Sequence, residues 1–172
     1  PPPGRAHGDG PAGYAARGGM YFAHKYPERR AQMDLLLGAA VDVSPRMEHG
    51  LEIFSRFQGG DERYQFPEPF GSRVVGSLDY DRMLTAYREY KVFLNVNSVV
   101  DSPSMCARRV FEITACGTPV VTTPSAAIRE FFPPDEVFVV GERAEAAHTI
   151  GALVRSRALR GRRAAGQAGP GA

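Results

Sequence analysis

The sequence predicts a doubly wound α/β domain, in which helices cover both faces of a parallel sheet of about six strands. Short apolar runs alternate with helical patterns, and several runs are apolar throughout, as in strands buried on both faces. The 172 residues, 43% of them hydrophobic and 23% charged, fit one globular domain. No apolar run approaches the roughly 20 residues of a membrane span, and no secretory leader is visible.

The expected strands are the short apolar runs, taken in chain order. They cover residues 20–23, 51–54, 73–75, 92–96, 119–122 and 136–140. Between the first two, Pro27 suits the first turn of a helix, and Met33, Leu36, Leu37 and Ala40 follow at helical spacing. This periodicity predicts a helix that packs on the sheet through one apolar face.

Capping residues mark the next helices. Asp79 or Asp81 can cap the helix that precedes the fourth strand. Ser102 or Ser104 can cap the helix after that strand, and Gly117 stands where a left-handed C-cap belongs. An alanine-rich helix over residues 142–159 is expected to close the domain.

Both ends of the chain are rich in Pro or Gly, so they are expected to lie outside the core. We expect a disordered arm or linker over residues 1–19, the ordered domain over 20–159 and a basic disordered tail over 160–172. The long segment 55–72 interrupts the alternation of strands and helices. This segment can be a functional or partner-facing loop, or a surface loop without a function.

The net charge of +2 is unevenly distributed. The last 18 residues contain five arginines and no acidic residue, namely Arg155, Arg157, Arg160, Arg162 and Arg163. Such a run can bind nucleic acid or anionic lipid, but more often it is a solvated helix end. No RNA-binding aromatic motif or zinc-finger spacing is present, so nucleic acid is not an expected partner.

The two cysteines, Cys106 and Cys116, are both expected on one helix, where ten residues separate them by about 15 Å. This separation is too long for a disulfide. Reduced thiols favour a cytoplasmic protein. The four histidines have no ligand-like spacing, so no structural zinc site is expected.

A ligand site is expected at the carboxyl ends of the parallel strands. His24, Lys25, Glu28, Arg29 and Arg30 follow the first strand, and Asn97, Ser98, Asp101 and Ser104 follow the fourth and lead into a helix N-terminus. Unpaired N–H groups at such an N-terminus form an anion site, and Lys25, Arg30 and Arg109 around it would suit a diphosphate. No P-loop motif occurs.

Glu112 lies two turns into that predicted helix, between Phe111 and Ile113. A carboxylate there can accept hydrogen bonds from both hydroxyls of a ribose. It can equally be an exposed side chain that pairs with Arg108 or Arg109 at helical spacing, for about 0.2–0.5 kcal/mol. Spacing alone does not separate these two interpretations.

The run from 109 to 121, Arg-Val-Phe-Glu-Ile-Thr-Ala-Cys-Gly-Thr-Pro-Val-Val, resembles the donor-site segment of retaining GT-B glycosyltransferases. Residues 87–97 resemble the helix-to-strand step of the same group. Within it, the CgeB-like branch, named for a spore-maturation protein, similarly pairs an R-x-F-E run with a short Gly-Ser-Leu segment, here 76–78. The resemblance covers residues 20–153 and implies one Rossmann-like half of a GT-B fold.

The resemblance also implies roles for single residues. Glu112 would bind the ribose of a nucleoside-diphosphate sugar, and the turn from Gly76 to Leu78 would lie against the base. Lys25 and Arg30 would face the diphosphate, and the helix N-terminus at Ser104 would approach the phosphates or the sugar. Asn97 and Arg109 complete the expected donor-binding set. Many relatives have a sugar-contacting glutamate at the position of Ser104. CgeB-like members commonly lack that glutamate, as this chain does.

The implied function is glycosyl transfer from a nucleotide sugar, without a metal and without a further cofactor. A chain of this length holds only the donor half, so an N-terminal acceptor-binding domain and the catalytic residue would lie elsewhere. A noncatalytic binding or assembly module is the alternative. A flavodoxin- or receiver-like signalling domain is disfavoured, because no acidic cluster follows the first strand to hold magnesium. The composition, with only two lysines, indicates a GC-rich bacterial source.

Overall fold

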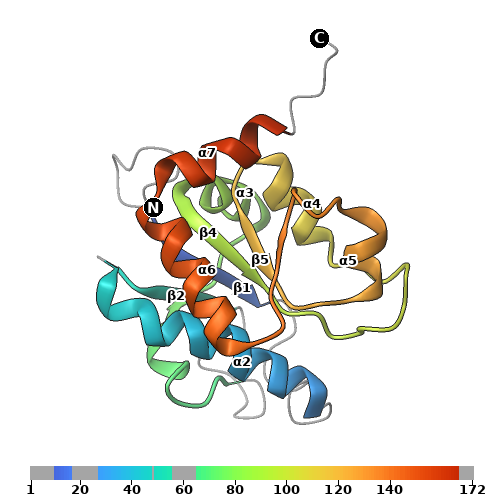
Figure 1. Cartoon of the computed structure of the whole chain (residues 1–172). Helices are drawn as coiled ribbons and strands as arrows, with labels where there is room; N and C mark the ends of the chain where they lie inside the picture. The colour runs from blue at the N-terminus through green and yellow to red at the C-terminus, as the bar shows by residue number, and fades with distance from the viewer. Residues whose placement is uncertain (1–9, 17–26, 48, 56–64, 167–172) are drawn as a thin grey trace.

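The computed structural model describes residues 10–16, 27–47, 49–55 and 65–166 (Figure 1). The strands are β1 (Gly10–Ala16), β2 (Leu51–Ser55), β3 (Val74–Gly76), β4 (Tyr90–Asn95), β5 (Val120–Thr122) and β6 (Phe138–Val139). The α-helices are α2 (Pro27–Val43), α3 (Tyr80–Glu89), α4 (Arg108–Ala115), α5 (Ala126–Phe131), α6 (Arg143–Arg155) and α7 (Arg157–Gly166). Two short 3-10 helices, η1 (Ser44–Arg46) and η3 (Gly71–Arg73), precede β2 and β3.

The strands form one parallel sheet in the order β3-β2-β1-β4-β5-β6. This confirms the predicted doubly wound α/β domain with six parallel strands. The strand order reverses between β1 and β4, because the chain builds outward from β1 through β2 to β3 and then returns to place β4 on the other side of β1. Ligands of open parallel sheets bind outside the carboxyl ends of the strands at such a point.

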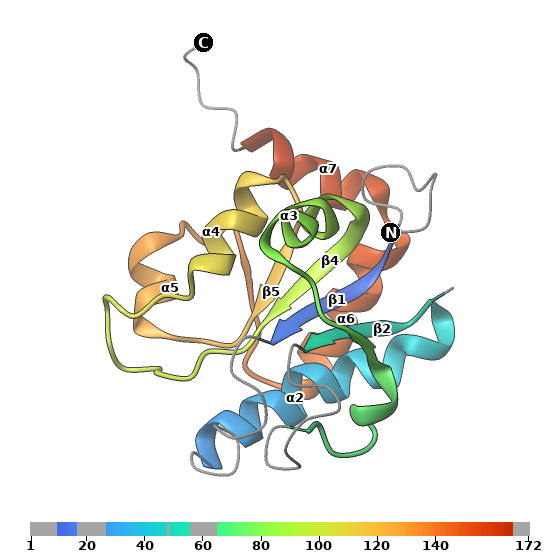
Figure 2. The ribbon, with the colours of Figure 1, turned by 180° about the vertical axis from the view of Figure 1, so that it is seen from behind.

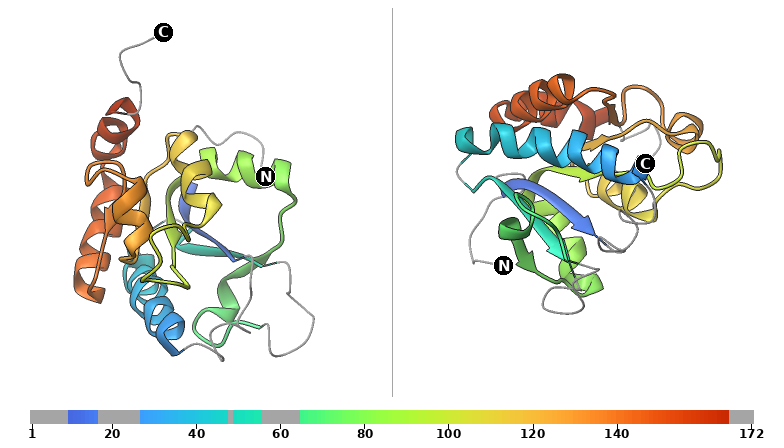
Figure 3. Two further views of the ribbon diagram at one scale, coloured as in Figure 1. Left: turned by 90° about the vertical axis from the view of Figure 1, so that its right-hand side faces the viewer. Right: turned by 90° about the horizontal axis from the view of Figure 1, so that it is seen from below.

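Helices cover the sheet on both faces, as the two opposite views in Figures 1 and 2 show. Along β4, Val92 and Leu94 lie in the cluster of apolar side chains from α2 and α6, whereas Phe93 lies in the cluster from α3, α4 and α5. Alternate side chains of a strand point to opposite faces, so β4 is buried on both. In the right-hand view of Figure 3, α2 and α6 lie side by side on one face.

The central strand β1 lies where the sequence analysis expects a disordered arm, so that expectation is wrong for Gly10–Ala16. The expected first strand at residues 20–23 lies outside the described residues. A Cβ added to Gly13 would lie 2.9 Å from ring atoms of both Phe93 and Tyr90. The backbone of β1 therefore passes close beneath two aromatic rings, and its small residues permit this approach. The same residues favour a linker when only the sequence is considered.

Two further expectations need correction. Helix α4 begins at Arg108 after an N-cap at Ala107 without a side-chain cap bond, so Ser102 and Ser104 lie in the preceding loop. Cys106 consequently precedes the helix, although both cysteines are free. The expected disordered tail is wrong in its first part, because α7 continues to Gly166. Within the described ranges, no helix combines the length and apolarity that crossing a bilayer requires.

Candidate functional site

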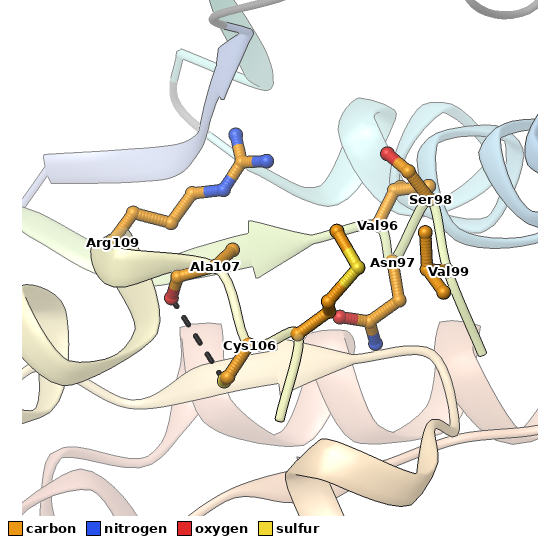
Figure 4. A pocket seen from close by; sticks show the side chains of 8 residues that line it. Val96, Asn97, Ser98, Val99, Cys106, Ala107 and Arg109 are labelled. Atoms are coloured by element: carbon orange, nitrogen blue, oxygen red, sulfur yellow. Dashed lines mark hydrogen bonds between the residues drawn. The ribbon is translucent and has the colours of Figure 1, made fainter. Parts of the chain in front are cut away.

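A pocket of about 190 Å³ opens at the carboxyl end of β4, beside the point where the strand order reverses (Figure 4). The loop that follows β4 forms one wall, and the start of α4 forms the other. Its lining residues are Val96, Asn97, Ser98, Val99, Met105, Cys106, Ala107 and Arg109. This volume is below that of a typical site for a whole organic ligand, so the pocket suits one portion of a larger molecule.

A buried polar network supports the pocket from beneath. Asn95 and Thr122 are fully buried, at 0% exposure, at the ends of neighbouring strands. Asn95 donates through Nδ2 to Asn97 Oδ1 and to Thr122 Oγ1, at 3.0 Å each. Asn97 donates to Thr122 Oγ1 at 3.1 Å and to the carbonyl of Thr123. Buried amides joined in this way hold the loop after β4 in one conformation.

Arg109 connects this network to the pocket wall. Its Nε donates a 2.9 Å hydrogen bond to Asn95 Oδ1. Arg109 stands in the first turn of α4, where the unpaired backbone N–H groups already favour an anion. The expected placement of Arg109 near a helix N-terminus is thus found in the structure, and its side chain lines the pocket.

Arg29, in the first turn of α2, supplies a second cation at this edge of the sheet. Its side chain is 96% buried, its Nη1 donates to Ser98 Oγ, and its Nε is buried without a hydrogen-bond partner in the described structure. A buried guanidinium without an acidic partner is unfavourable unless an anion binds there. Ser98 lines the pocket, so this hydrogen bond joins Arg29 to a residue of the pocket wall.

Glu112 lies one helical turn beyond Arg109 on α4. Its side chain is 12% exposed, and its Oε1 lies 2.8 Å from Arg108 Nε. Tyr80, at the start of α3, donates through its hydroxyl to the same Oε1 at 3.2 Å. Glu112 Oε2 is buried and has no hydrogen-bond partner among the described residues. The ion pair with Arg108, one of the two partners in the alternative to ribose binding, is thus present, and it leaves one carboxylate oxygen for another donor.

Among the described residues, the others expected in the donor site do not line the pocket. Arg30 points to solvent and lies 3.9 Å from Asp34, with both side chains about half exposed. Ser104 is exposed in the loop, 3.4 Å from the hydroxyl of Ser102. Lys25 lies outside the described residues. Asn97 and Arg109 thus line one pocket, Glu112 lies one turn farther along α4, and the Arg30 side chain faces solvent.

The expected base-contacting turn ends β3. Gly76 has a φ of 125°, a conformation that L side chains rarely adopt. Leu78 is half-buried against the apolar cluster that α3 and α4 share. The turn leads to Asp79, whose carboxylate accepts from the backbone N–H of Arg82 and caps α3. This cap places Tyr80 beside Glu112.

Cys106 contributes a thiol to the pocket lining. Burial raises the pKa of this thiol above its ordinary value, against the smaller lowering effects of the Ala107 backbone and of Arg109. The thiol is therefore protonated at neutral pH and a poor nucleophile. Among the residues that the structure describes, no three His, Cys, Asp or Glu side chains gather as metal ligands would.

Residues 36–170 match the family described as glycosyl transferase-like. The match spans most of the chain. This chain belongs to the glycosyl transferase-like family. Glu112 and all the residues that line the pocket lie within the matched range.

Solved structures agree with this domain in fold. A sucrose-phosphate synthase from Thermosynechococcus elongatus is 19% identical, with a TM-score of 0.64 over 92% of this chain and 40% of that one. An α1,3-fucosyltransferase is 14% identical, with a TM-score of 0.56 over 90% and 36%. A GtfA/B complex chain is 14% identical, with a TM-score of 0.58 over 92% and 31%. The glycosyl transferase-like domain thus has the Rossmann-like fold of a GT-B half.

The domain spans 31% to 40% of the length of these three solved chains. No curated protein sequence gives a significant match. At these identities the solved structures establish the fold, and the particular ligand must be argued from the residues of the site.

The donor-binding set expected from the sequence omits four residues of the candidate site in this glycosyl transferase-like domain: Arg29, Tyr80, Asn95 and Arg108. Of these, Arg29 is expected only as a residue that follows the first strand, and Arg108 only as one of two alternative partners of Glu112. Arg29 and Arg30 are adjacent, and the sequence signal that separates them is helical phase. Arg29 lies four residues before Met33, which is buried on the same face of α2. No comparable signal joins Tyr80 to Glu112, because their contact spans 32 residues.

Proposed function

We propose that this chain is the donor-binding half of a glycosyltransferase that uses a nucleoside-diphosphate sugar. The single observation that carries the proposal is the buried Oε2 of Glu112, which has no donor in the described structure. An unsatisfied buried acceptor is costly, and a ribose hydroxyl is a donor of the right kind. The family match and the resemblance of the 109–121 run to GT-B donor segments support the same ligand.

The diphosphate of the donor would lie in the pocket between Arg109 and Ser98. Positions 109 and 112 are three residues apart on α4, so their side chains are neighbours on one helix face. A nucleotide with its ribose at Glu112 would consequently carry its phosphates toward Arg109 and the N-terminus of α4. Arg29 would add positive charge from behind Ser98.

The chemistry of the donor half would be electrostatic. As the bond between the sugar and the diphosphate breaks, negative charge grows on the leaving phosphate oxygen. Arg109, Arg29 and the N–H groups of α4 would stabilise that charge, so the step requires no metal. The turn from Gly76 to Leu78 would contact the base through its backbone, since it leads directly to Tyr80 beside Glu112.

The acceptor, and the residue that activates it, would belong to an N-terminal domain outside this chain. The solved neighbours, whose names include a fucosyltransferase and a sucrose-phosphate synthase, are two to three times longer than the part that this chain covers. The CgeB-like branch and a cytoplasmic bacterial setting are parts of the same proposal. Ser104 in place of a sugar-contacting glutamate favours one alternative, a module that binds the nucleotide sugar without transferring it.

Calorimetric titration of the chain with UDP, GDP, ADP and CDP tests the proposal. We expect one of these nucleotides to bind, and Glu112→Gln to weaken its binding by about tenfold or more, as for a lost hydrogen bond to a charged group. Glu130→Gln, an exposed position on α5, is the matched control and should leave the affinity unchanged. Binding that is absent, or that Glu112→Gln does not weaken, would overturn the proposal.

A further inference from the structure

The two carboxylate oxygens of Glu112 have different surroundings. Both neighbouring donors, Arg108 Nε and the Tyr80 hydroxyl, contact Oε1, at 2.8 and 3.2 Å. The buried Oε2 receives no hydrogen bond within the described structure. Each carboxylate oxygen can accept more than one hydrogen bond, so Oε2 could also accept one. The difference between the two oxygens therefore results from where Tyr80 and Arg108 lie.

Tyr80 and Arg108 also contact each other. The guanidinium carbon of Arg108 lies 5.4 Å from the centre of the Tyr80 ring, within the range of a cation–π interaction. The three side chains therefore form a closed cluster between the first turn of α3 and the first two turns of α4. Each member restricts the rotation of the other two.

The cluster is placed at the surface and not in the core. Tyr80 is 47% exposed and the Arg108 side chain is 65% exposed, whereas the Glu112 side chain is 12% exposed. Exposed side chains contribute little to stability by packing, and an exposed ion pair contributes little by charge. A cluster that orients a carboxylate at the edge of the candidate site has a clearer role in binding than in stability.

We infer that Tyr80 is a positioning residue for Glu112 and thereby sets a preference for a ligand with a vicinal diol. This inference rests on the proposed function. The Tyr80 hydroxyl occupies Oε1 together with Arg108, so Oε2 points in one direction and receives the 2′- and 3′-hydroxyls of a ribose together. A 2′-deoxyribose offers only one of these two donors and leaves the oxygen partly unsatisfied.

Removal of the Tyr80 hydroxyl would relax this preference. Without it, Oε1 keeps only the exposed Arg108 as a partner, and the carboxylate is free to turn about its terminal torsion, which has broad minima. The affinity for a ribonucleotide then falls more than the affinity for its 2′-deoxy form. A purely structural role for Tyr80 predicts an equal change in both.

The test compares Tyr80→Phe with the unchanged chain by calorimetry, using the nucleoside diphosphate that binds best among UDP, GDP, ADP and CDP and its 2′-deoxy form. We expect a ribose preference of about tenfold or more in the unchanged chain. In Tyr80→Phe this preference should fall to about threefold or less. The phenylalanine ring retains the contact with Arg108, so the variant removes the hydroxyl alone.

Tyr90→Phe is the matched control. The Tyr90 hydroxyl also donates to a carboxylate, that of Glu52, but Tyr90 begins β4 at the opposite end of the strand from the pocket. This variant should keep the full ribose preference. An unchanged preference in Tyr80→Phe, while Glu112→Gln still weakens binding, would overturn the role of Tyr80 and leave the proposed function standing. If none of the four nucleotides binds, both proposals fail.

Discussion

Arg109 is held by Asn95, which accepts a 2.9 Å hydrogen bond from the Arg109 Nε. The amide of Asn95 cannot turn to another orientation without cost, because its Nδ2 is already bound to Asn97 and Thr122. A fully buried amide on β4 thus fixes the direction of an arginine on α4. The relationship links the core of the sheet to the wall of the pocket.

Replacement of Asn95 by Leu should therefore reduce both stability and nucleotide affinity. The apolar side chain removes the donor to the buried Asn97 Oδ1 and one of the donors to Thr122 Oγ1, at a cost of about 1–3 kcal/mol in unfolding free energy. Urea unfolding measures this loss, and titration with the bound nucleoside diphosphate measures the loss of affinity. Glu130→Gln, at an exposed position on α5, should change neither quantity. A stable Asn95→Leu variant with full affinity would contradict the proposed role.

Replacement of Arg29 by Met should separate stability from binding. The buried guanidinium has an unpartnered Nε, so an apolar side chain of similar length should leave the free energy of unfolding unchanged or raise it by about 1–2 kcal/mol. Nucleotide affinity should fall by about tenfold, because the positive charge that Arg29 adds near the diphosphate is lost. Thermal unfolding and calorimetry measure the two effects. Arg30→Met, whose ion pair with Asp34 is exposed, should alter both only slightly. A large loss of stability in Arg29→Met would show that the cation is structural.

Gly13 should not tolerate a side chain. In Gly13→Val the new Cβ would meet ring atoms of the buried Phe93 and of Tyr90 at 2.9 Å, and overpacking of this kind costs about 1–3 kcal/mol. Denaturant unfolding should show the loss as a lower midpoint. Gly141→Ala is the control, because no atom lies within 4 Å of its added Cβ. If Gly13→Val were as stable as the unchanged chain, β1 would not occupy the centre of the sheet.

The ion pair between Asp42 on α2 and Arg143, the first residue of α6, should make the free energy of unfolding depend on pH in the acid range. Hydrogen bonding to Arg143 lowers the pKa of Asp42, with Nε–Oδ2 at 2.7 Å and Nη2–Oδ1 at 2.8 Å. The pKa of Asp42 is therefore lower in the folded chain than in the unfolded chain. The ion pair stabilises the fold at a pH above the unfolded pKa of Asp42, and this stabilisation is lost as the pH falls through the folded pKa. The raised pKa of Arg143 acts only at strongly alkaline pH.

Both side chains of this pair are about half exposed, so its contribution should not exceed about 1 kcal/mol. A double-mutant cycle of Asp42→Asn and Arg143→Gln, measured at pH 7 and at pH 2.5, gives the coupling free energy. We expect it to vanish at the lower pH. A coupling that is the same at both values would show that the carboxylate charge is not involved.

Cys106 should react slowly with iodoacetamide at pH 7.5. Burial raises the pKa of its thiol, so the reactive thiolate fraction is below that of free N-acetylcysteine, and the rate should rise as the pH increases. Mass spectrometry of the labelled peptide follows the reaction. Because Cys106 lines the pocket, a bound nucleoside diphosphate should slow the labelling further. Labelling as fast as that of N-acetylcysteine would contradict the burial of this thiol.

The sheet could be predicted from the sequence wherever burial and pattern agree. β4 and β5 are apolar runs that the fold buries on both faces, so hydrophobicity alone located them. β1 is the exception. Its glycines and proline are typical of a linker. The small residue at Gly13 is required by contact with two aromatic rings of β4, and no local sequence pattern reveals such a tertiary contact.

The candidate site divides in the same way. Arg109 and Glu112 could be placed from their spacing on one helix and from the motif around them. The choice between Arg29 and Arg30 depends on which face of α2 meets the sheet, and the helical phase of Arg29 relative to Met33 is the one signal for it. The start of α4 was also misplaced, since serines that suit a cap lie in a loop and the helix begins without one.

The central position of β1 has a consequence for the order of folding. Its pairing with β4 joins Ala12 to Val92 and Tyr14 to Leu94, about 80 positions along the chain. During synthesis β1 leaves the ribosome long before β4, and β2 is the first strand that it can pair with. Closure over such a distance is slow, since chain entropy is lost before the contact forms. The sheet thus completes late, and until then β1 exposes an unpaired edge to other chains.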